Sequence, residues 1–131
     1  MFRAYIMEKI TTEIARFLSD RNWDKPLPGD VAKSICIESA ELLEAFQWGN
    51  IDTPKLTKNK KLFRQVQHEL ADVFIYGFVL ALSLGLDPEK IIRAKLARVR
   101  RKYPARLMRS HVPQHNTAYH SIKASYRQKA R

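Results

Sequence analysis

The sequence predicts an all-α protein: a helical bundle of four main helices that is completed by oligomerisation and carries a basic C-terminal extension. Apolar residues recur at three- and four-residue steps through four long segments, and strand-like alternation is absent. Of the 131 residues, 45% are apolar, which is enough to form a packed core. We therefore expect one domain over residues 1–104, followed by a basic tail over residues 105–131.

The first two helices are separated by a segment rich in helix breakers. Residues 1–18 carry an apolar residue at nearly every third or fourth position, which predicts a helix. Residues 19–29 contain two prolines and a glycine and form a connection. We expect Asp30 to be the N-cap of a second helix that runs to about Trp48. Residues 51–56 are expected to form a turn.

The third expected helix is the most apolar part of the chain. It runs over residues 58–84, and its stretch 73–84 is apolar almost all round. Such a helix has to be buried on most sides, so we expect a subunit interface to cover it. A fourth helix, with Pro88 at its first position, should run to about Tyr103. Within the tail, residues 121–130 have the pattern of a short basic helix.

The charge of the chain is unevenly distributed. It contains 24 Lys and Arg against 13 Asp and Glu, a net charge of +11. Residues 1–104 account for +5, and the acid-free tail of residues 105–131 accounts for +6. A basic end of this kind can bind nucleic acid through phosphate contacts. A non-catalytic helical module that binds nucleic acid or a partner through this end is therefore the alternative function, and a solvated extension is the simpler interpretation of the tail.

Other features narrow the class of protein. Cys36 is the only cysteine, so no intrachain disulfide can form, and a reducing compartment is the simplest expectation. The sequence contains no run of 18 apolar residues, so it predicts no transmembrane helix. The N-terminal residues do not resemble a signal peptide. A glycine-rich phosphate loop is also missing from the sequence. We expect a cytoplasmic protein.

Four acidic residues have the spacing of a metal site. Glu38 and Glu41 are three residues apart on the second expected helix, and Glu69 and Asp72 are three apart on the third. Residues at this spacing share a helix face, so antiparallel packing of the two helices would gather four carboxylates. These hard oxygen ligands suit Mg²⁺ or Mn²⁺ and metal-assisted phosphoryl chemistry. Solvated acidic faces are the alternative. A dinuclear iron site is disfavoured because no His follows a Glu by three residues.

The motifs around these acids resemble a known family. Residues 38–48 read Glu-Ser-Ala-Glu-Leu-Leu-Glu-Ala-Phe-Gln-Trp, and residues 69–76 read Glu-Leu-Ala-Asp-Val-Phe-Ile-Tyr. With Arg21-Asn22-Trp23 upstream and Arg101-Lys102-Tyr103-Pro104 downstream, they are similar to the all-α MazG-like nucleoside triphosphate pyrophosphohydrolases, especially the small dCTP pyrophosphatase-type members. The resemblance implies Mg²⁺-dependent hydrolysis of nucleoside triphosphates, deoxy or non-canonical, to monophosphate and pyrophosphate. It also implies a role in nucleotide-pool house-cleaning by a homodimer or homotetramer.

The resemblance assigns a role to each matching position. The metal ligands would be Glu38, Glu41, Glu69 and Asp72. The residue that orients or deprotonates the attacking water would be Glu41 or Glu44. The substrate-binding residues would be Trp23, Trp48, Tyr76, Lys95, Arg98 and Lys102. The two tryptophans would pack around the base or sugar, Tyr76 would touch the nucleotide, and the three bases would neutralise the phosphates.

Structural roles compete with some of these assignments. Trp48 and Tyr76 could be core residues, and Glu44 could be a solvated helix acid. The sequence also departs from the family pattern. Relatives have a Phe-His pair shortly after the loop tryptophan, which is absent after Trp23, and Val99 occupies a position that is often Asn. The base and phosphate contacts are therefore the least transferable part of the resemblance.

Overall fold

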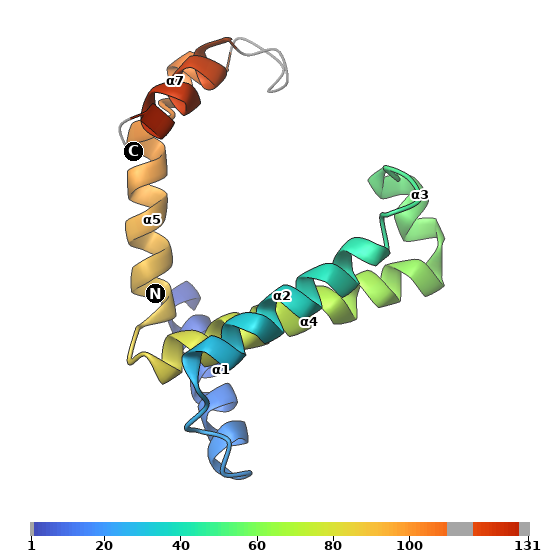
Figure 1. Cartoon of the computed structure of the whole chain (residues 1–131), viewed down its shortest axis with the longest axis vertical. Coiled ribbons are helices and arrows are strands. Elements are labelled where there is room, and N and C mark those ends of the chain that lie inside the picture. Colours follow the sequence, from blue (N-terminus) through green and yellow to red (C-terminus); the bar gives the residue numbers. More distant parts are fainter. Residues whose placement is uncertain (1, 110–116, 129–131) are drawn as a thin grey trace. The chain divides into compact units, whose positions relative to one another are not determined.

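The computed structural model describes residues 2–109 and 117–128. Every regular element in these two ranges is a helix, and no strand occurs in them, which confirms the all-α prediction (Figure 1). The helices are α1 (Phe2–Ser19), α2 (Pro28–Glu44), α3 (Thr53–Lys58), α4 (Lys60–Ser83), α5 (Pro88–Lys102), α6 (Ala105–Met108) and α7 (Thr117–Gln128).

The boundaries of α2 differ from those expected. Leu27 is the N-cap and Pro28 is the first helical residue, so Asp30 lies inside the first turn and is not the cap. Proline is favoured at this position because its fixed φ suits a helix start and its missing N–H would have no helical partner. The helix ends at Glu44 rather than at Trp48. Beyond it, hydrogen bonds of the i to i+3 type close a series of turns.

A short helix replaces the turn that was expected over residues 51–56. The Asp52 carboxylate accepts a hydrogen bond of 2.9 Å from the backbone N–H of Lys55, and Pro54 lies in the first turn of α3. This N-cap and proline together start a helix. The side chain of Asn59 then caps the start of α4 in the same way.

The far end of α4 is closed by a glycine, as expected. Gly85 has a φ of +65°, a conformation that only glycine adopts at little cost. The N–H of Leu86 donates to the carbonyl of Ala81 at 2.8 Å, and that of Gly85 donates to Leu82 at 3.0 Å. This pair of bonds is a Schellman motif, which satisfies carbonyls that the helix end would leave open.

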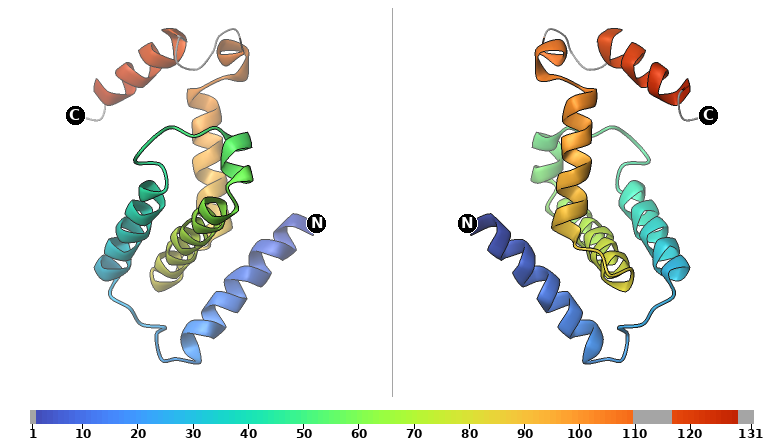
Figure 2. Two further views of the ribbon diagram at one scale, coloured as in Figure 1. Left: turned by 90° about the vertical axis from the view of Figure 1, so that its right-hand side faces the viewer. Right: turned by 90° about the vertical axis from the view of Figure 1, so that its left-hand side faces the viewer.

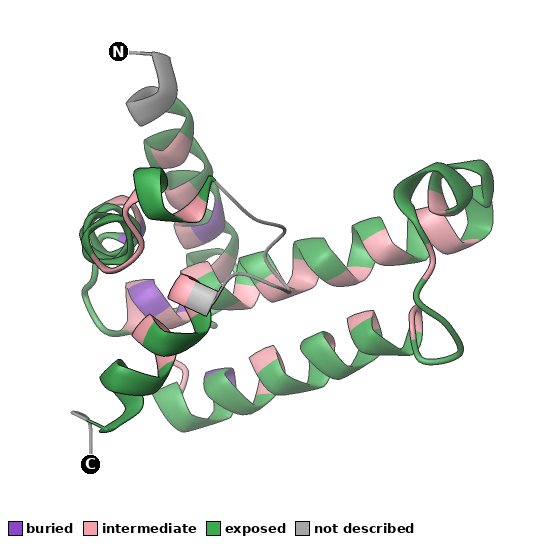
Figure 3. Ribbon diagram, turned by 90° about the horizontal axis from the view of Figure 1, so that it is seen from above, coloured by how far each residue is buried: buried purple, intermediate pink, exposed green. Residues whose placement is uncertain are grey.

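Residues 1–89 form one compact unit, built around α4. α2 and α4 lie antiparallel along much of their lengths, and α1 packs against α4 on its other side (Figure 2). The core is small: Ile14, Val31 and Val79 are buried, with Tyr76 and Leu80 packed against them. Most other positions are exposed or half-buried (Figure 3).

The apolar stretch 73–84 of α4 is only partly covered in the single chain. Val79 and Ala81 are buried, whereas Phe74 is 59% exposed and Leu84 is 51% exposed. An apolar helix that stays open to water on one side leaves room for a further partner. The expected completion of the bundle by a second subunit stays a prediction.

Residues 90–131 form the second compact unit. Tyr103, just after α5, stacks on Tyr119 of α7 with ring centroids 5.2 Å apart. The Lys102 ammonium lies 4.2 Å from the centroid of the Tyr126 ring. The short helix expected over residues 121–130 corresponds to α7, which begins earlier, at Thr117. Residues 129 and 130 lie outside the described part.

In the described ranges, no single helix is long and apolar enough to cross a membrane, although α4 and α5 pass the same test when they are counted together as a bent pair.

Candidate active site

Three of the four expected metal ligands lie together between α2 and α4. Carboxylate oxygens of Glu38, Glu41 and Glu69 all lie within 4.8 Å of one another. The reason is the spacing: Glu38 and Glu41 are one turn apart on α2, and the antiparallel neighbour α4 brings Glu69 to the same level. Glu38 and Glu69 are half-buried, and Glu41 is exposed.

We call Glu38, Glu41 and Glu69 the acid cluster. The fourth expected ligand, Asp72, interacts electrostatically with this cluster. The pKa of Glu38 is raised from its ordinary value of 4.5, first by partial burial and then by the negative charges of Glu41, Asp72 and Glu69. Asp72 therefore acts on Glu38 without belonging to the tightest group. Like charges held this close disfavour the fully ionised state, so a bound cation would stabilise it.

The ligand chemistry of the acid cluster fits a hard divalent cation. All its donors are carboxylate oxygens, which suit Mg²⁺, Mn²⁺ or Ca²⁺ better than the imidazole- and thiolate-preferring metals. Three carboxylates on two helices also leave coordination positions for water and for phosphate oxygens.

An aromatic pocket lies beside these acids. It has a volume of about 560 Å³ and is formed by α1, the loop after it, α2 and α4. Its lining residues are Glu13, Ile14, Phe17, Leu18, Trp23, Pro26, Asp30, Val31, Ser34, Asp72, Ile75, Tyr76 and Val79. Asp72 links the two features, since it lines the pocket and also raises the pKa of Glu38.

The hydrogen bonds at the C-terminal end of α1 position Trp23 at the pocket. Asn22 has a φ of +56°, the N–H of Trp23 donates to the carbonyl of Leu18 at 2.9 Å, and the N–H of Asn22 donates to Ser19 at 3.1 Å. This is a second Schellman motif, with asparagine in the left-handed position. It places the Trp23 ring edge-on to Phe17, with the centroids 6.1 Å apart.

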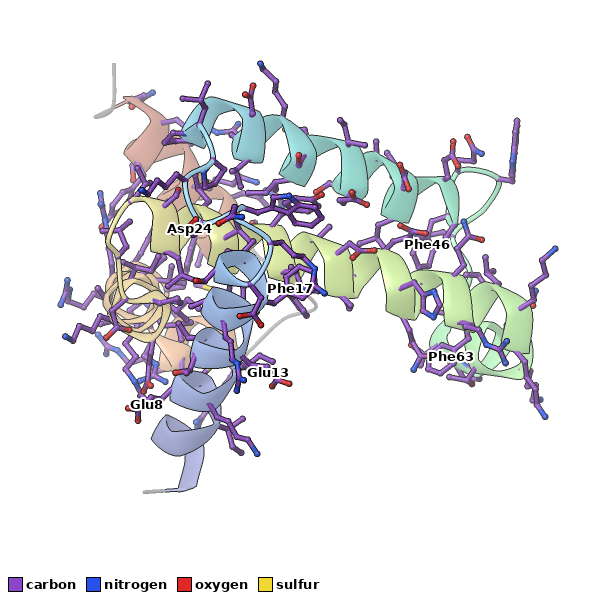
Figure 4. The ribbon with its side chains drawn as sticks, turned by 90° about the horizontal axis from the view of Figure 1, so that it is seen from below. Glu8, Glu13, Phe17, Asp24, Phe46 and Phe63 are labelled. Atoms are coloured by element: carbon purple, nitrogen blue, oxygen red, sulfur yellow. The ribbon has the colours of Figure 1, made fainter. Side chains whose placement is uncertain are left out.

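Phe17 also contacts Arg21. Its carbonyl accepts a 3.0 Å hydrogen bond from the Arg21 guanidinium, whose central carbon lies 3.9 Å from the centre of the Phe17 ring. In Figure 4, Phe17 and Asp24 lie towards one end of α4, whereas Phe46 and Phe63 lie towards the other.

The remaining expected site residues of the first unit have different settings. Tyr76 lines the pocket one turn after Asp72, and it also packs against the core, so both interpretations of this residue apply. Trp48 is 92% exposed and is not part of the pocket lining. Glu44 is exposed at the last position of α2, one turn beyond Glu41.

The three bases expected at the phosphates belong to α5, in the unit of residues 90–131. Lys95 and Arg98 are exposed, and Lys102 is half-buried with its ammonium over Tyr126. Their part in binding phosphate stays a prediction.

Sequence reasoning missed the pocket residues that α1 contributes. Ile14, Phe17 and Leu18 follow the three- and four-residue spacing of the apolar face of α1, so the signal was present but indicated only core packing. Asp30 and Ser34, on the first turns of α2, also line the pocket. Only the packing of three helices reveals that these residues surround a cavity.

Fold and site define an all-α protein with a carboxylate-rich centre beside an aromatic pocket. The MazG-like family profile matches residues 33–110, more than half of the chain and a range that includes all four expected metal ligands. The chain belongs to the MazG-like family, as its motifs predicted.

Two curated relatives and one solved structure are similar to this chain. The chain is 33% identical over 106 residues to dCTP pyrophosphatase 1 of Homo sapiens, covering 79% of this chain and 62% of the relative. It is 30% identical over 105 residues to dCTP pyrophosphatase 1 of Bos taurus, with the same coverage. The chain thus spans less than two thirds of these proteins. A crystal structure of a pyrophosphatase from Archaeoglobus fulgidus has a TM-score of 0.63 and 34% identity, covering 75% of this chain and 92% of that one.

Proposed function

We propose that this protein is a Mg²⁺-dependent nucleoside triphosphate pyrophosphohydrolase that removes deoxy or non-canonical nucleotides from the nucleotide pool. It would convert a nucleoside triphosphate and water to the monophosphate and pyrophosphate. One observation carries the proposal: Asp72 joins a group of three converging carboxylates to an aromatic pocket of about 560 Å³, which has room for a nucleotide base. The names of the similar proteins, dCTP pyrophosphatase 1 and a pyrophosphatase, support the reaction class.

The acids would divide into ligands and a water-positioning group. Glu38, Glu41, Glu69 and Asp72 would hold Mg²⁺, with Mn²⁺ as a substitute. When bound, the metal would neutralise phosphate oxygens and favour ionisation of a water molecule. Glu41, the exposed member of the acid cluster, is our first choice for the residue that orients the water and accepts its proton, ahead of Glu44.

The base would lie in the aromatic pocket, between the Trp23 side and the Tyr76 side. The aromatic rings that line the pocket suit a planar base, because they can stack on its face. Trp48, fully open to water in the single chain, would contact substrate only once a second subunit covers it. A homodimer or homotetramer would also cover Phe74 and the rest of the open side of α4.

The phosphates would be neutralised further by Lys95, Arg98 and Lys102 of α5. Spacings of three and four residues put these bases on one face of the helix. We therefore assign the catalytic part to residues 1–104 and leave residues 105–131 outside it. A cytoplasmic location would give such an enzyme access to the nucleotide pool.

Hydrolysis of a panel of ribo- and deoxynucleoside triphosphates tests the proposal. Products are separated by anion-exchange chromatography, so that monophosphate plus pyrophosphate is distinguished from diphosphate plus phosphate. We expect turnover that requires Mg²⁺ and is lost in Glu69→Gln, while Glu8→Gln, an exposed acid outside the acid cluster and the pocket, keeps full activity. Failure to cleave any nucleotide, at enzyme levels that suffice for a control pyrophosphohydrolase, would refute it.

A further inference from the structure

The net charge of the chain separates at the boundary between its two units. Residues 1–89 contain 11 Lys and Arg and all 13 acids, a net charge of −2. Residues 90–131 contain 13 Lys and Arg and no Asp or Glu, a net charge of +13. The proposed hydrolase activity does not require this division, because a single triphosphate needs only a few bases.

The bases of α5 lie on two sides of the helix. Lys95, Arg98 and Lys102 form the face proposed to bind the triphosphate. Arg93, Arg100 and Arg101 form a second face, since residues seven and eight apart fall on the same side, nearly opposite the first. A small ligand held on the first face does not contact the second.

More bases follow on the next two helices. Arg106 and Arg109 are exposed at and just after α6, and Lys123 and Arg127 lie on α7. Because residues 90–131 contain no Asp or Glu, these cations have no carboxylate side chain of their own unit to pair with. The guanidinium group also predominates here, with eight arginines against five lysines, and its planar fork binds phosphate oxygens in pairs.

The tyrosines of this unit organise the basic surface. Tyr103 and Tyr119 stack on each other at 5.2 Å, and Tyr126 lies beneath the Lys102 ammonium at 4.2 Å. Rings engaged in this way do not serve as free platforms for base stacking. A polyanion would therefore be held mainly through its phosphates, without preference for sequence.

We propose that residues 90–131 bind nucleic acid through its phosphate backbone, independently of sequence, at a surface centred on Arg100 and Arg101. The net charge of +13 supplies the attraction, and its spread over three helices fits a ligand with many phosphates. This activity is separate from the proposed hydrolysis and does not rest on it.

An anionic membrane is the less favoured polyanion. A helix that lies in a lipid surface inserts large apolar side chains, typically with Trp or Phe among them, and α5 and α7 contain neither. Tyr119 of α7 is engaged by Tyr103. α5 does expose aliphatic side chains, Ile91, Ile92 and Leu96 among them, so anionic vesicles form one arm of the test.

The test measures the affinity of the full chain for fluorescein-labelled duplex DNA and for single-stranded RNA of the same length, by fluorescence anisotropy, between about 50 and 200 mM salt. The variant is Arg100→Ala/Arg101→Ala. The matched control is Lys60→Ala/Lys61→Ala, an adjacent exposed pair at the start of α4. Circular dichroism verifies that each variant keeps its helices, and nucleotide hydrolysis is measured in parallel.

We expect wild type and control to bind both nucleic acids with a strong salt dependence. Each duplex phosphate contact contributes about 0.9 to the slope of log affinity against log salt, so losing two should reduce the slope by about 1.8 and the affinity near 100 mM by roughly 60-fold. Hydrolysis should be unchanged in the variant. Loss of binding in Arg106→Ala/Arg109→Ala as well would support a surface spread over α5 and α6.

Three results would overturn the proposal. The first is undetectable binding of wild type at about 50 mM salt, where contacts of this kind are strongest. The second is an unchanged salt slope in Arg100→Ala/Arg101→Ala. The third is binding to vesicles of anionic lipid without binding to either nucleic acid, which would assign the surface to a membrane.

Discussion

The left-handed residue Asn22 should determine how well the aromatic pocket is formed. Its φ of +56° costs most residues about 1–2 kcal/mol, and a β-branched residue is among the least suited to it. Asn22 is exposed, so Asn22→Val removes little packing and acts through the backbone. If the chain relaxes to avoid the strain, it gives up the N–H bonds to Ser19 and Leu18, worth about 1 kcal/mol each. In both cases the free energy of unfolding should fall by about 1–2 kcal/mol.

Urea unfolding of the full chain measures this loss, and the matched control is Asn22→Gly. Glycine accepts a positive φ, so the control should stay within a few tenths of a kcal/mol of wild type. A Trp48→Phe background makes Trp23 the only tryptophan, so its emission reports whether the ring still packs against Phe17. If Asn22→Val unfolds like wild type, or Asn22→Gly loses as much as Asn22→Val, the account of the helix end is wrong.

Four further changes test other parts of the structure. The raised pKa of Glu38 means that the folded protein holds this proton more tightly than the unfolded chain, so the contribution to stability is full below pH 4.5 and is lost as pH rises through the folded-state pKa. Glu38→Gln should therefore gain stability relative to wild type towards pH 7 in EDTA, by urea unfolding; an equal pH profile for the two would argue against a repulsive cluster. Trp23→Ala should raise the KM for nucleotide more than kcat falls. Trp48→Ala should leave nucleotide affinity unchanged in a monomer and reduce it only in an oligomer, which gel filtration distinguishes; a loss in the monomer would place Trp48 at the base. Gly85→Ala should destabilise the fold by about 1 kcal/mol, because alanine must adopt the left-handed conformation there; no change in the urea midpoint would mean that the turn can adopt another form.

The long helices were predictable because their signals are local. The periodicity of α1, the glycine after α4 and the proline at the start of α5 each depend on a few neighbouring residues. α3 was missed because Asp52 and Pro54 also occur in turns, and a six-residue helix has too few turns to show a period. The acid cluster followed from the spacing of its members once antiparallel packing of two helices was assumed.

The pocket could not be predicted in the same way. Phe17 and Val31 are apolar residues at helical spacing, a pattern that indicates core packing equally well. Trp23 is placed by a single positive φ at Asn22, which the sequence suggests only as one option for an asparagine. Trp48, beyond the end of α2, has no pattern to fix its direction, and in the single chain it is open to water. Tertiary packing, not local preference, decides which of these residues surround a cavity.

The separation of charge would let one chain serve the two proposed kinds of phosphate ligand. A nucleoside triphosphate in the pocket would meet Asp72 and the acid cluster in a unit of net charge −2, so it would need a divalent cation to approach them. The acid-free unit of residues 90–131 attracts phosphates without a metal. Removing divalent metal should therefore affect the two ligands differently: hydrolysis would stop, whereas binding of a polynucleotide would tighten slightly, because divalent cations compete for its phosphates.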